Sequence, residues 1–193
     1  MIHLGYLIFY KNIPKFEAWL QRWVTNTIYS HVSISLGNKL SEIDAYGEFE
    51  ADLKVRLHSF HRRSGNMDVL KIIGVPYSVL WYSLKYVIDK YEGKTYGFIS
   101  WLTIAIRYAF EKLGFKEVYK WNILWGWGVI CSELVYYYFI LIAEEMNITQ
   151  GTNFTLWRQL RYELSRHQAD TFTPKDIELL ARAYPELFEW DIK

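Results

Sequence analysis

Residues 29–37 read Tyr-Ser-His-Val-Ser-Ile-Ser-Leu-Gly, and this stretch carries the clearest pattern in the chain. From residue 31 onward, apolar and polar residues alternate, with His31, Ser33 and Ser35 on one side and valine, isoleucine and leucine on the other. Successive side chains of a β-strand point to opposite faces, so the pattern predicts a half-buried strand with a histidine on its polar face. The Gly-Asn pair that follows predicts a turn.

Further strands are predicted on both sides of this segment. The residues concerned are 4–10, 41–46, 51–58 and 67–75. We expect residues 41–46, Ser-Glu-Ile-Asp-Ala-Tyr, to pair with the histidine strand as its antiparallel neighbour, because only a short turn separates the two.

Helical patterns dominate the chain after residue 76. Helices are predicted at 14–28, 77–91, 98–113 and 131–146. A last helix is predicted from Thr173-Pro174 to about residue 183, because the threonine can cap it and proline suits its first turn. Strands come first and most helices second, which predicts an α+β fold. The length of 193 residues predicts one domain, residues 1–193.

Composition and charge exclude several classes of protein. The formal net charge is +1, so we expect no nucleic-acid binding. A single cysteine excludes an internal disulfide and a thiolate-rich zinc site, and we expect no metal or other cofactor. Aromatic residues make up 19% of the chain, which suits a core of amphipathic rings and leaves contact with a membrane surface open.

The apolar run at residues 121–143 is long enough for a membrane span. Its two glycines, Gly126 and Gly128, and the central Glu133 favour a buried helix, so we expect no transmembrane segment. The chain opens without a basic start or a small-residue cleavage site, so we expect no secretory signal. The location then stays open between the cytoplasm and delivery by lysis or in a phage particle.

The side chains best suited to carry out a reaction are those of Cys131 and His31. Cys131 stands where an apolar helix is expected to begin, and a helix N-terminus lowers the pKa of a thiol. An imidazole from the polar face of a strand can complete the activation, so the pair predicts a thiolate nucleophile with a histidine base. The alternative is a small core cysteine and a structural histidine.

A histidine base needs an acceptor that fixes its tautomer. Asp44, on the polar face of the expected neighbouring strand, is our prediction for this role. Glu42, Glu48 and Glu50 are weaker candidates.

Five short pieces then follow one another in a characteristic order. They are Tyr-Ser-His-Val-Ser-Ile-Ser-Leu-Gly, Glu-Ile-Asp-Ala, Tyr-Glu-Gly-Lys-Thr-Tyr-Gly, Cys-Ser-Glu-Leu-Val and Phe-Thr-Pro-Lys-Asp-Ile. Together they resemble the permuted papain-like cysteine enzymes of the NlpC/P60 superfamily, in particular the YiiX/YaeF-like group. The resemblance spans roughly residues 4–180. It implies a circularly permuted papain-like fold, an antiparallel sheet packed against helices, with the histidine strand first and the nucleophile helix later.

The resemblance also implies residue roles. Cys131 would be the nucleophile, His31 the base and Asp44 the orienting group, where the family often has glutamate. Tyr96 would line the substrate cleft. The implied activity is a cysteine hydrolase of the peptidase or amidase type, acting through an acyl-enzyme on amides such as cell-wall peptides. A lipid acyltransferase or thioesterase, and a non-catalytic structural protein that keeps the fold, stay open as alternatives.

Overall fold

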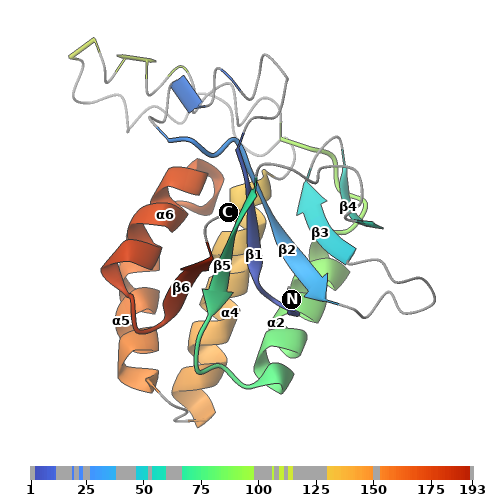
Figure 1. Ribbon diagram of the computed structural model, residues 1–193, viewed down its shortest axis with the longest axis vertical. Coiled ribbons are helices and arrows are strands. Elements are labelled where there is room, and N and C mark those ends of the chain that lie inside the picture. Colours follow the sequence, from blue (N-terminus) through green and yellow to red (C-terminus); the bar gives the residue numbers. More distant parts are fainter. Residues whose placement is uncertain are drawn as a thin grey trace.

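The computed structural model describes residues 3–11, 19, 22–23, 27–37, 47–51, 54–59, 67–97, 106, 109–110, 113–114, 130–149 and 153–191. Within them the chain forms an α+β fold with one six-stranded antiparallel sheet in the order β4-β3-β2-β1-β5-β6 (Figure 1). The α+β class expected from the sequence is therefore confirmed.

The strands are short and the helices longer. The strands are β1 (Leu7–Tyr10), β2 (His31–Gly37), β3 (Gly47–Ala51), β4 (Val55–Ser59), β5 (Met67–Ile72) and β6 (Phe188–Asp191). The helices are α2 (Tyr77–Tyr91), α4 (Cys131–Thr149), α5 (Phe154–Leu164), the 3₁₀ turn η3 (Ala169–Thr171) and α6 (Pro174–Ala183).

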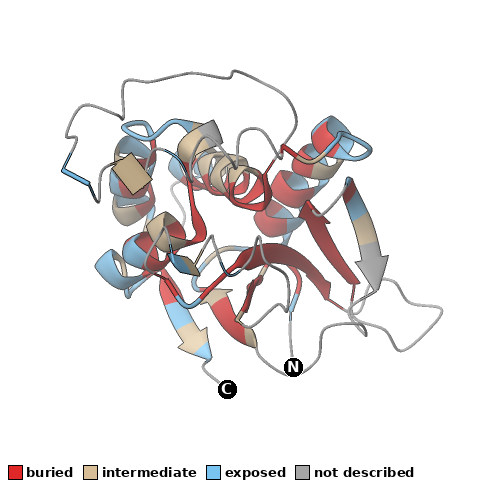
Figure 2. Cartoon of the chain, turned by 90° about the horizontal axis from the view of Figure 1, so that it is seen from above, coloured by how far each residue is buried: buried red, intermediate tan, exposed pale blue. Residues whose placement is uncertain are grey.

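The apolar face of the sheet packs against the helices, which gather over one side of it (Figure 2). Val32 and Ile34 of β2 are fully buried and share a core with Leu134 and Val135 of α4. This is the apolar side of the alternation in residues 31–36, so the strand predicted there is confirmed as β2. The prediction that it is half-buried is wrong, because the polar side chains of His31, Ser33 and Ser35 are buried as well. Burial of this face against α4 also fixes which way the polar side chains of β2 point.

The neighbour of β2 differs from the expectation. β2 pairs with β1 on one side and with β3 on the other, and the predicted strand at 41–46 lies outside the described residues. The predicted strand at 51–58 in fact spans a reversal, because Ala51 at the end of β3 pairs with Val55 at the start of β4. The alternation in Gly-Glu-Phe-Glu-Ala matches that in residues 41–46, so local pattern alone could not choose between them.

Two predicted helices are confirmed with their ends. α2 covers Tyr77–Tyr91, and Gly93 follows it with a φ of 82°, a left-handed conformation that suits glycine. Thr173 caps α6 in a reciprocal capping box with Asp176, and Pro174 is the first helical residue. The predictions at 14–28 and 98–113 lie largely outside the described residues.

The helix that carries the cysteine begins at Cys131 as predicted and continues to Thr149, three residues beyond the expected end. Most of the apolar run before it lies outside the described residues. In the part of the chain that the structure describes, no helix combines the length and apolar character that a membrane crossing needs. The sequence did not predict α5 or β6.

Candidate active site

His31 is the first residue of β2. Its imidazole lies on the polar face of this strand, where it contacts the carboxylate of Glu50. Its Nε2 lies 2.7 Å from Oε2 of Glu50 on β3, and both side chains are buried, with relative exposures of 8% and 0%. The ring of Tyr10, its cross-strand neighbour on β1, lies 5.7 Å from the imidazole between ring centres. Because Nε2 faces Glu50, the ring nitrogen that remains for a second partner is Nδ1.

That second partner is Cys131, the first residue of α4. Its thiol interacts electrostatically with the His31 imidazole, and the backbone N–H groups of Val32 and Ser132 also act on its sulfur. The hydroxyl of Ser132 donates to the carbonyl of Phe172 at 2.5 Å, which ties the start of α4 to the segment before α6. The structure thus brings together the two residues that the sequence singled out, His31 and Cys131, which are the first residues of β2 and α4 and lie 100 positions apart in the chain.

The electrostatics of the pair favour a charged thiolate and imidazolium. Burial alone would raise the pKa of the Cys131 thiol, but the His31 imidazolium and the two backbone N–H groups outweigh it and lower that pKa. Burial alone would lower the pKa of His31, but Cys131 and Glu50 outweigh it and raise that pKa to about 10. Opposite charges in contact stabilise each other more strongly where water is excluded.

Asp44, predicted to orient the histidine, lies outside the described residues. Among the described residues, the carboxylate that contacts His31 is that of Glu50, which the sequence analysis gave as a weaker candidate. Positions 44 and 50 differ by an even number, so both fall on the same face of a regular strand, and a pattern argument cannot separate them. Glu50 could have been found only by knowing that Gly47–Ala51 is the strand next to β2.

A second buried carboxylate lies two residues before Glu50. Glu48 accepts hydrogen bonds on Oε2 from the hydroxyl of Tyr10 and, at 2.5 Å, from the hydroxyl of Ser33. Its side chain is fully buried, and the pairing of Ser35 with Glu48 places it on the polar face of the sheet. Glu48 therefore joins β1, β2 and β3 beside the histidine.

Tyr96, predicted to line the cleft, lies beside the edge strand β4. It follows Thr95, which forms an isolated bridge with Lys54, and its partly buried ring packs against the core. Its substrate-binding role stays a prediction. Within the described ranges, no three His, Cys, Asp or Glu side chains are grouped so as to hold a metal ion.

Compared with models of protein families, the chain matches none, and no curated protein matches it. The assignment of a function therefore depends on the geometry of the site.

Proposed function

We propose that the protein is a cysteine hydrolase of amide bonds in which Cys131 is the nucleophile, His31 the acid and base, and Glu50 the orienting group. The observation that carries the proposal is the convergence of a helix-start cysteine, a strand histidine and a buried glutamate: the histidine is hydrogen-bonded to Glu50, and it and Cys131 act on each other's pKa. A thiol that is merely a core residue has no need of a paired imidazole with its own carboxylate. On this proposal the fold is the circularly permuted papain-like one that the sequence resembles.

The chemistry proceeds by acyl transfer. The Cys131 thiolate attacks the carbonyl carbon, a C–S bond forms, and the charge on oxygen is stabilised by backbone N–H groups at the start of α4. His31 donates its proton to the leaving nitrogen as the C–N bond breaks, which leaves an acyl-enzyme. The neutral imidazole then takes a proton from water, and attack by that water breaks the C–S bond and releases a carboxylate.

The role of Glu50 follows from its contact. Its carboxylate on Nε2 keeps Nδ1 directed at the sulfur and stabilises the imidazolium that donates the proton. Cys131 is only 2% exposed, so a substrate reaches the sulfur only when the atoms that cover it move aside. The rate at which the Cys131 thiol reacts should therefore be compared among variants of this chain, because a free thiol in solution is not covered in this way.

The proposal is tested by trapping the acyl-enzyme. The protein is mixed with p-nitrophenyl acetate and a mass spectrum is recorded; since Cys131 is the only cysteine, a thioester adduct identifies the site without ambiguity. We expect the adduct in the wild type, its loss in Cys131→Ser and a strong decrease in His31→Gln. Amide hydrolysis is then measured on cell-wall stem peptides. Equal acylation of wild type and His31→Gln, with both folded, would overturn the proposal.

A further inference from the structure

A hollow of about 470 Å³ lies beside the end of β1, separate from the residues of the proposed triad. Its volume is in the range of small-molecule sites. The lining residues are Lys11, Trp19, Arg22, Trp23, Thr27 and Ile28. Lys11 follows Tyr10, and Ile28 comes three residues before His31, so the hollow adjoins the end of the sheet where the histidine lies.

The walls of the hollow include large apolar side chains that are about half exposed to solvent. Trp19, Trp23 and Ile28 are 51%, 53% and 58% exposed, and the two indole rings are nearly parallel, at 12°, with their centres 6.4 Å apart. Large apolar side chains gathered around a concavity and left in contact with water mark sites that bind an apolar group.

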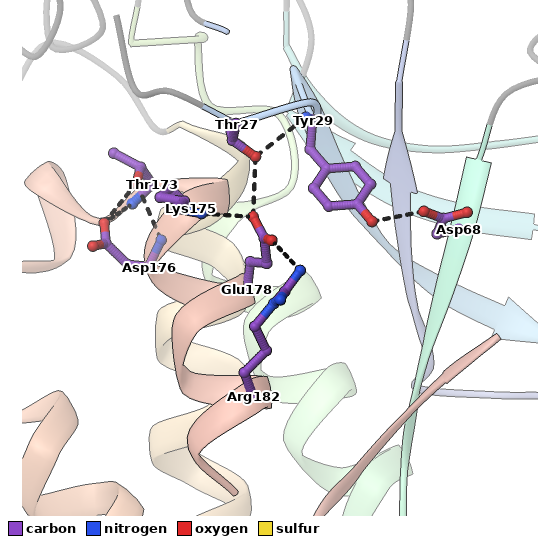
Figure 3. Close-up of polar contacts among 8 residues, drawn as sticks. All are labelled: Thr27, Tyr29, Asp68, Thr173, Lys175, Asp176, Glu178 and Arg182. Carbon is purple, nitrogen blue, oxygen red and sulfur yellow. Dashed lines mark hydrogen bonds and ion pairs between the residues drawn. The ribbon is translucent and has the colours of Figure 1, made fainter. Parts of the chain in front are cut away.

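Two of the polar residues that line the hollow, Lys11 and Thr27, are held by buried carboxylates. Lys11 Nζ lies 2.7 Å from Oδ1 of Asp68, and the Tyr29 hydroxyl donates to the other carboxylate oxygen, Oδ2, at 2.6 Å. Thr27 donates to Oε2 of Glu178 at 3.2 Å, and Figure 3 shows this contact linking the segment before β2 to α6. Groups that are held before binding lose little entropy when a ligand arrives.

Among the described residues that line the hollow, the two charged side chains, Lys11 and Arg22, are both cations. A guanidinium nitrogen of Arg22 donates to the backbone carbonyl of Lys11 at 3.5 Å, which places the guanidinium beside the backbone of Lys11. Asp68 balances the charge of Lys11, and the described residues that line the hollow include no carboxylate, which leaves the charge of Arg22 in excess. An arginine beside apolar walls suits a carboxylate at the end of an apolar chain.

We propose that this hollow binds a small amphiphilic carboxylate, with its apolar chain against Trp19 and Trp23 and its charged end at Arg22. The site is distinct from the Cys131–His31 pair, and the proposal stands whether or not the protein is a hydrolase.

The test is a calorimetric titration with octanoate below its micelle concentration. We expect saturable binding to the wild type, and binding about tenfold weaker in Arg22→Gln and in Trp23→Ala. Trp81→Ala is the matched control, because Trp81 is 36% exposed on α2 and does not line the hollow. Its affinity should equal that of the wild type, as should that of Cys131→Ser.

Two analogues of the same chain length test the charge. Octanol should bind more weakly than octanoate, and octyltrimethylammonium more weakly still. Absence of octanoate binding, equal affinity for the ammonium analogue, or affinity unchanged in both Arg22→Gln and Trp23→Ala would overturn the proposal. Sedimentation with anionic vesicles without binding of monomeric octanoate would also overturn it, and would assign the surface to a membrane.

Discussion

Nε2 of His31 lies 2.7 Å from Oε2 of Glu50, and the two residues come from adjacent antiparallel strands. Strand pairing sets this contact, since Ile34 lies opposite Phe49 and alternation then puts Glu50 on the face that carries the histidine. The contact leaves the other side of the ring to Cys131. Three segments that are separate in the sequence thereby meet at the imidazole of His31.

Replacement of Glu50 by glutamine should make the Cys131 thiol less acidic. Glu50 raises the pKa of His31, so its removal lowers the fraction of imidazolium, which is the main group that lowers the thiol pKa. The midpoint of the pH dependence of iodoacetamide alkylation should therefore move to higher pH than in the wild type. Asp44→Asn is the competing variant, and a shift in Asp44→Asn but not in Glu50→Gln would return the orienting role to Asp44.

The titration of His31 should depend on Cys131. In the wild type the ring should stay protonated to a pH near 10, because the raised pKa keeps the charged form stable above its ordinary range. Cys131→Ser removes the largest of the interactions that raise this pKa, so the ring should lose its proton at lower pH. Nitrogen NMR of the imidazole measures both midpoints, and identical midpoints would show that the two side chains do not interact.

The hydroxyls of Tyr10 and Ser33, which both donate to Glu48, should contribute to the free energy of unfolding in a coupled way. Tyr10→Phe and Ser33→Ala each remove one donor from the same buried carboxylate oxygen, and each should cost about 1–3 kcal/mol of unfolding free energy. Because the two share one acceptor, their effects in the double variant should not add. Urea unfolding measures this, with Tyr82→Phe, whose side chain is exposed, as the control expected to change nothing. Additive effects would contradict the shared acceptor.

Loss of the cap on α6 should destabilise the protein moderately. Thr173 accepts from the backbone N–H of Asp176, and alanine at a helix N-cap costs about 0.5–2 kcal/mol. The control is Thr149→Ala at the exposed C-terminal end of α4, which should change the unfolding free energy little. Thermal or urea unfolding compares the two, and an equal loss in both would argue against a capping role.

The sequence by itself determined the local features of the structure, which depend only on residues close together in the chain. Alternation identified the apolar and polar faces of β2, and the threonine-proline start placed α6, because these signals act within a few residues of the chain. The start of α4 at Cys131 was predicted in the same way. The candidate catalytic pair, Cys131 and His31, was also predicted from the sequence, because cysteine and histidine are rare in this chain and these two stand at the ends of clear elements.

Only the tertiary structure decided which carboxylate meets the histidine. Asp44 and Glu50 have the same parity on similar alternating segments, and the choice between them depends on which segment pairs with β2. Pairing is set by burial of Phe49 and Ala51 in the common core, a collective effect that no local pattern contains. The contact of Cys131 with His31 is decided in the same way, because it requires α4 to pack on the sheet with its first residue at the start of β2.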